Sequence, residues 1–202
     1  MNNHNLSSCL LELQSSDSDR QVRALDWYFR LPAATISKTE RQAVLLAGVK
    51  ALEISDNPYP IAERLLRFRE EAVPCLSELL TRNTSAEVNT LAALILVNNG
   101  SRLGVPALVA EVECGGEFIS LASHALANAG FTEHVSAIID WLRRWPMPPD
   151  REFPTGDDDL ALSLLDVLNR LQMPLPEDIR QKFSEPGVPA FFRTAIERSS
   201  PD

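Results

Sequence analysis

Two stretches of the sequence repeat one pattern: Ser85–Gly100 reads SAEVNTLAALILVNNG, and Gly115–Gly130 reads GGEFISLASHALANAG. Small residues, leucine and glycine recur 30 positions apart, in the pairs Ala92/Ala122, Leu96/Leu126 and Gly100/Gly130. A fixed period of about 20–50 residues is typical of proteins built from stacked repeats. The sequence therefore predicts a repeat architecture, and it says much less about function.

Each unit is predicted to be a pair of helices. Apolar side chains recur at helical spacing in its first half, which gives the first helix an apolar face. Gly100 and Gly130 suit the left-handed backbone position that follows a helix C-terminus. Pro106 suits the first turn of a second helix, because proline there removes no backbone hydrogen bond. A pair of this kind must stack on its neighbours to bury its apolar face.

The units also share an order of features: a polar or acidic cap, a valine, two small residues, a small residue with leucine, a glycine and then Val-Pro. This order resembles the HEAT-like repeats of the bacterial phycocyanobilin-lyase type over about 60 residues, and more weakly over about 100 others. Asn89 and Ile119 stand where that family often has arginine. The resemblance implies an α-solenoid. It does not imply lyase activity, because most proteins with such repeats are scaffolds and binders.

We therefore predict an all-α fold, a short α-solenoid of about five HEAT-like helical pairs, with residues 1–202 as a single domain. Its parts are irregular N-terminal helices in 5–54, the best repeats in 59–142, a proline-rich loop in 146–156 and C-terminal helices in 157–198. Irregular outer pairs are expected, since terminal repeats cap the stack.

Local signals place several helix ends. Three helices are predicted to begin at side chains that can accept a hydrogen bond from a backbone N–H. The capping residues are Asn5 or Ser7 for the first helix, Asp17 to Asp19 for the second, and Ser37 or Thr39 for the third. The last two starts predict helices over 20–31 and 40–54, and the apolar spacing predicts another over 61–69. Glu87 and Glu117 are expected in first turns, where negative charge complements the helix dipole.

Charge and composition exclude some classes of function. The net charge is −9, whereas a nucleic-acid-binding protein normally has a basic face, so no nucleic-acid partner is expected. No run of 18 apolar residues and no secretory signal is visible, so neither a membrane span nor export is expected. The three cysteines form no CxxC motif and leave an odd count. That usage favours free thiols in a reducing cytoplasm.

No recognisable catalytic or metal-binding motif occurs. His4, His124 and His134 lack the spacing of metal ligands. There is no GxSxG motif and no phosphate-binding loop, and the carboxylate runs, such as Asp157 to Asp159, suit helix ends. We therefore expect no cofactor, no metal and no enzyme.

One line of side chains is a candidate partner-binding surface. In each unit, one position lies between the two small residues and the small residue with leucine, and another lies one helical turn later. The two positions lie on one flank of the helix, so equivalent side chains of successive units would form a line. These positions hold Arg64, Leu94, Asn98, His124, Asn128, Asp166 and Arg170. In a solenoid they would follow the concave side. The line is either a partner-binding groove or an ordinary polar face, and Trp145 is either an interface anchor or a core side chain.

The resulting prediction is a protein-binding α-solenoid in the cytoplasm. Small bacterial proteins with degenerate repeats often resemble immunity proteins that neutralise a toxin, and the acidic chain would suit a basic toxin domain. The alternatives are an adaptor or regulatory scaffold in a larger complex and a chromophore-lyase-like enzyme. Only His124 with Asp166 could supply the acid or base of such an enzyme. The oligomeric state stays open.

Overall fold

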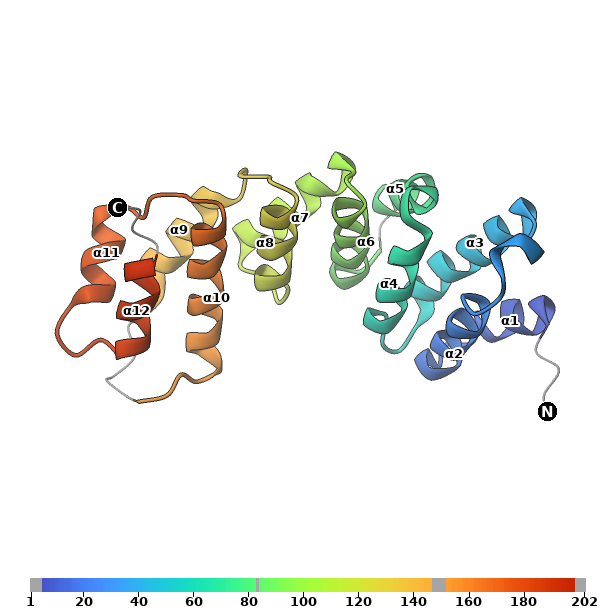
Figure 1. Ribbon diagram of the computed structural model, residues 1–202, viewed down its shortest axis with the longest axis horizontal. Helices are drawn as coiled ribbons and strands as arrows, with labels where there is room; N and C mark the ends of the chain where they lie inside the picture. The colour runs from blue at the N-terminus through green and yellow to red at the C-terminus, as the bar shows by residue number, and fades with distance from the viewer. Residues whose placement is uncertain (1–4, 83, 147–151, 199–202) are drawn as a thin grey trace. The chain divides into compact units, whose positions relative to one another are not determined.

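The computed structural model describes residues 5–82, 84–146 and 152–198. All regular structure in these ranges is helical, with no strand, which confirms the all-α prediction (Figure 1). The α-helices are α1 (Leu6–Glu12), α2 (Ser18–Tyr28), α3 (Lys38–Ile54), α4 (Tyr59–Leu65), α5 (Val73–Leu80), α6 (Ala86–Asn98), α7 (Val105–Cys114), α8 (Ile119–Asn128), α9 (Val135–Arg144), α10 (Gly156–Arg170), α11 (Glu177–Ser184) and α12 (Ala190–Arg198). Short 3-10 helices are η1 (Ala33–Thr35), η2 (Leu66–Ala72) and η3 (Arg102–Gly104).

The chain divides into two compact units, Met1–Ala107 (unit 1) and Leu108–Asp202 (unit 2). Unit 1 contains α1 to α6, and unit 2 contains α8 to α12. Each has its own apolar core: Leu96 of unit 1 and Leu126 of unit 2 are both fully buried. The stacking of all pairs into one solenoid stays a prediction.

The predicted caps at the start of the chain are confirmed. Asn5 Oδ1 accepts the Ser8 N–H at 2.9 Å, and Asp17 Oδ1 accepts the Arg20 N–H at 3.1 Å. Ser37 caps α3 in a reciprocal capping box with Glu40. Each such cap typically stabilises a helix by about 1 kcal/mol, because it satisfies a donor that the helix itself cannot.

The helix starts and ends predicted from the Val-Pro and glycine positions of the repeats are also confirmed. Val73 begins α5 and Val105 begins α7, each followed by proline. Gly100 and Gly130 have φ angles of 78° and 76°, in the left-handed region that ends helices. The Val-Pro and glycine signals therefore fix the boundaries of helices in both units.

Two predicted helices end too late. The helix predicted over 20–31 ends at Tyr28, and the one predicted over 61–69 ends at Leu65 and continues as η2. Arg69 has a φ of 53°, a left-handed conformation that a helix cannot contain. Asn99 Nδ2 donates to the Arg69 carbonyl at 3.1 Å and holds this bend. The contact partner lies 30 residues away, so local periodicity does not reveal it.

The second repeat starts later than the 30-residue offset predicts. Glu117 lies before α8, because a turn through Gly115 and Gly116 occupies the equivalent positions. The Phe118 N–H donates to Glu111 Oε1 at 2.8 Å and secures that turn. Of the proline-rich loop predicted over 146–156, residues 147–151 lie outside the described part of the chain.

Candidate functional site

Packing of α8 against α10 in unit 2 brings four of the predicted site residues together (Figure 1). Arg170 Nε lies 2.8 Å from Asp166 Oδ2 on the same helix, and Arg170 Nη1 donates to Asn128 Oδ1 at 3.2 Å across the helix pair. His124 lies one turn before Asn128 on α8. We call the exposed or half-buried group of His124, Asn128, Asp166 and Arg170 the α8–α10 surface.

Two serines complete this surface, and the sequence prediction missed both. His124 Nε2 lies 2.9 Å from Ser163 Oγ, and Ser163 Oγ lies 2.6 Å from Ser120 Oγ. These contacts connect α8 to α10 through a continuous chain of hydrogen bonds. Ser120 precedes His124 by four residues and so shares its helix face, which was the available signal.

The electrostatics of the α8–α10 surface leave its imidazole neutral. Burial lowers the pKa of His124, the positive charge of Arg170 lowers it further, and Asp166 opposes the shift. At pH 7 the surface therefore carries one negative and one positive side chain, Asp166 and Arg170, which form an exposed ion pair. An exposed pair of this kind contributes at most about 1 kcal/mol to stability.

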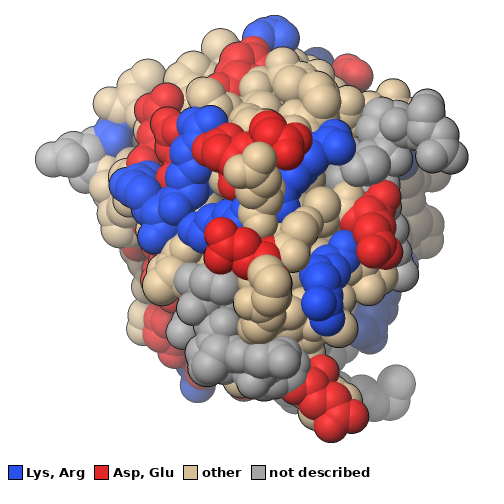
Figure 2. All heavy atoms as spheres, turned by 90° about the vertical axis from the view of Figure 1, so that its left-hand side faces the viewer, with Lys and Arg blue, Asp and Glu red and all other residues tan. Residues whose placement is uncertain are grey.

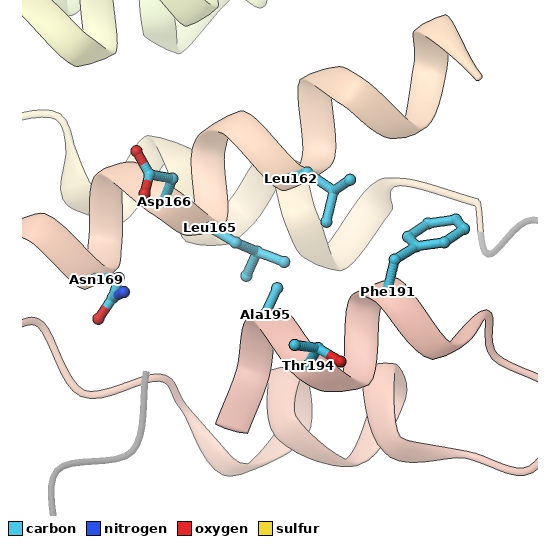
Figure 3. Close-up of a pocket in the computed structure, with 7 residues that line it drawn as sticks. All are labelled: Leu162, Leu165, Asp166, Asn169, Phe191, Thr194 and Ala195. Carbon is cyan, nitrogen blue, oxygen red and sulfur yellow. The ribbon is translucent and has the colours of Figure 1, made fainter. Parts of the chain in front are cut away.

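A groove between α10 and α12 adjoins this surface (Figure 3). Its volume is about 410 Å³. The described residues that line it are Leu162, Leu165, Asp166 and Asn169 of α10 and Phe191, Thr194 and Ala195 of α12. Asp166 therefore belongs both to the α8–α10 surface and to the rim of the groove.

The other two polar residues of the predicted line lie in unit 1. Arg64 Nε lies 3.2 Å from Asp26 Oδ1, and Arg64 Nη1 lies 2.9 Å from Glu63 Oε2. Asn98 is exposed, and its Nδ2 donates to the Leu94 carbonyl at 2.9 Å. Leu94 itself is buried. A continuous line that joins these side chains to those of unit 2 stays a prediction.

Trp145 is a core side chain, the second of the two alternatives that the sequence left open. Only 8% of the residue is exposed. Its ring centroid lies 5.3 Å from that of Phe192 and 6.1 Å from that of Phe183, with Trp141 stacked at 6.3 Å. The two phenylalanines come from α12 and α11, and neither was expected to meet Trp145.

Lys182 of α11 closes the end of α9 near this aromatic cluster. Its Nζ donates to the carbonyls of Leu142 and Arg143, at 2.8 Å each, and to that of Trp145.

An ion pair near this contact also joins α9 to α11, since Arg143 pairs with Asp178 of α11 at 2.6 Å. Figure 2 shows basic and acidic side chains side by side on this end of unit 2. Arg143 also pairs there with Asp140, at 3.0 Å.

The described residues contain no group of three or more His, Cys, Asp or Glu side chains that could hold a metal ion. None of the helices in the described ranges is long and apolar enough to cross a membrane. Comparison with protein-family models, with curated proteins and with solved structures gave no match. The HEAT-like resemblance therefore rests on the repeat residues alone.

Proposed function

We propose that this chain binds another protein through the α8–α10 surface of unit 2. The observation that carries the proposal is the arrangement of Asp166, Arg170 and Asn128. All three are exposed, and hydrogen bonds of 2.8 and 3.2 Å hold them in one geometry. Side chains that are ordered before binding lose less entropy when a partner arrives, so such a cluster suits recognition.

The partner that suits the chain best is a basic protein. The net charge of −9 attracts a positively charged partner and accelerates its diffusional encounter. We propose in particular that the chain acts in the cytoplasm as an immunity protein, which occupies a basic toxin domain and neutralises it. An adaptor in a larger complex would use the same surface without inhibiting its partner.

A second candidate function is acid–base catalysis, favoured by the contact between His124 and Ser163. A neutral imidazole 2.9 Å from a hydroxyl can accept its proton, which is the first requirement of a general base. Asp166 is the nearby carboxylate that acts on the pKa of this imidazole. A chromophore lyase would need such a pair beside a pocket. Loss of a measured turnover in His124→Gln would support this candidate.

Affinity capture with three baits tests the binding proposal. The baits are the wild type, the variant Asp166→Arg with Arg170→Glu, and the control Glu78→Arg with Arg82→Glu. Glu78 near the end of α5 and Arg82 just after that helix form a comparable i,i+4 ion pair, at 2.6 Å, with 68% and 48% of their side chains exposed. The tested pair is similarly exposed, at 49% for Asp166 and 54% for Arg170.

We expect one protein to be captured in stoichiometric amount by the wild type and the control, and to be lost from the α8–α10 variant. Growth arrest by that protein alone, relieved by co-expression of this chain, would support the immunity function. Unimpaired growth would favour the adaptor. Equal capture by all three baits would contradict the assignment of the α8–α10 surface.

A further inference from the structure

The groove between α10 and α12 has an apolar floor and a polar rim. In Figure 3 the side chains of Leu162, Leu165, Phe191 and Ala195 point toward the same space. Asp166, Asn169 and Thr194 supply the polar groups of the lining. An apolar hollow with a few polar groups at its edge is the usual form of a binding site, and its volume of about 410 Å³ lies in the usual range.

A carboxylate lies on the rim of the groove. Asp166 is the one ionisable side chain among the described residues of the lining. Its Oδ2 holds Arg170, which lies outside the lining, whereas its Oδ1 makes no hydrogen bond within the described part of the chain. A carboxylate oxygen accepts hydrogen bonds strongly from Lys and Arg side chains. The rim therefore offers an acceptor for a basic group.

We propose that this groove receives an amphipathic basic helix of the partner. Apolar side chains at helical spacing would lie on Leu162, Leu165 and Phe191, and a Lys or Arg one turn away would donate to Asp166 Oδ1. Recognition of a helix in a groove uses such i, i+3, i+4 and i+7 anchors. The proposal rests on the proposed function, because Asp166 belongs to both surfaces, and it states which chemical class of segment that surface binds.

A defined peptide tests the groove without the natural partner. The probe is a fluorescein-labelled amphipathic peptide of about 14 residues, roughly four helical turns, with leucine on one face and lysine on the other. Fluorescence anisotropy compares the wild type with Thr194→Trp, which fills the groove, and with Gln181→Trp. Gln181 is an exposed, uncharged residue of α11 and serves as the matched control. Helical circular dichroism and melting temperature establish that each variant folds.

The wild type and Gln181→Trp should bind the peptide with equal affinity. Thr194→Trp should weaken binding about tenfold or more, the scale on which interface anchors act. Asp166→Asn should weaken binding and reduce its salt dependence, and an analogue with glutamate for every lysine should bind least. Equal binding by Thr194→Trp, or equal affinity for the glutamate analogue, overturns the proposal. Concentration-dependent self-association that Thr194→Trp abolishes would identify a second copy as the occupant, and would also overturn it.

Binding of the captured partner to the Thr194→Trp and the Asp166→Arg, Arg170→Glu variants tests the groove and the proposed function separately. If Thr194→Trp binds that partner normally while the Asp166→Arg, Arg170→Glu variant does not, the groove assignment fails and the proposed function stands. If neither variant loses the partner, both fail. Loss of the partner from both variants supports the groove as part of the binding surface.

Discussion

The His124 ring on α8 and the Ser163 hydroxyl on α10 lie 2.9 Å apart and join the two helices that carry the candidate surface. Replacing Ser163 with alanine leaves a half-buried imidazole without this partner. We expect the free energy of unfolding of unit 2 to fall by about 1 kcal/mol, the usual net contribution of one hydrogen bond. Urea denaturation of Ser163→Ala and of the exposed control Ser184→Ala measures the difference. Equal stability of the two variants would show that the contact contributes nothing.

Acid should destabilise unit 2 through His134, which is fully buried. Burial lowers its pKa to about 4, against the opposing effects of Glu133 and of the Ser123 backbone. The unfolded chain has the ordinary histidine pKa of about 6.5 and so binds the proton more tightly than the folded chain. The contribution to stability is therefore complete above about pH 6.5 and is lost as the pH falls toward 4, by about 3 kcal/mol in total.

Denaturation curves test this expectation on the wild type and His134→Phe, from about pH 7.5, one unit above the ordinary histidine pKa, down to about pH 4, the pKa of His134 in the folded chain. The variant lacks the titrating group, so its stability should fall less steeply through this range. Parallel pH profiles would mean that His134 is not responsible for the acid sensitivity.

Lys182 should be one of the most sensitive surface positions of unit 2. Its ammonium group satisfies carbonyls at the end of α9, which have no donor within the helix. Lys182→Met keeps the length of the side chain and removes the donors. We expect a loss of about 2 kcal/mol, since a charged group stabilises the carbonyls that it contacts more than a neutral donor does. Gln181→Met on the same helix is the control in thermal and urea denaturation. A change as small as that of the control would rule out the capping role.

Much of the fold follows from local signals in the sequence. Asn5, Asp17 and Ser37 cap helices as predicted, because capping depends on residues within one turn. Gly100 and Gly130 end helices because only glycine adopts their backbone conformation without steric cost. The late end predicted for the helix over 61–69 has a different origin. At Arg69, a contact from Asn99 outweighs the local helical pattern.

The candidate site, like the fold, has features that the sequence predicts and features that depend on long-range contacts. The repeat offset places His124, Asn128, Asp166 and Arg170 on the same flank of successive helices, and in the structure α8 and α10 bring these side chains together. The prediction followed one repeated position and therefore missed Ser120 and Ser163. The sequence pattern also does not reveal contacts between distant residues. Trp145 packs against Phe183 and Phe192, which belong to helices near the end of the chain.

Leu96 and Leu126 test whether the two units unfold separately. Both side chains are fully buried, one in each unit. Truncation of either to alanine should cost about 2–5 kcal/mol, because it removes buried apolar surface and leaves a cavity. Amide hydrogen exchange should show the loss of protection mainly in the unit that carries the substitution. A loss below about 1 kcal/mol would contradict the assigned core.

The affinity of the captured partner measures whether the α8–α10 surface holds it. Isothermal titration should give wild-type affinity for the Glu78→Arg, Arg82→Glu control. The Asp166→Arg, Arg170→Glu variant should bind more weakly by about 2 kcal/mol or more, the scale of an interface hot spot, while its melting temperature stays near that of the wild type. If the control abolishes binding and the α8–α10 variant binds normally, the partner uses another surface and the assignment of the α8–α10 surface is wrong.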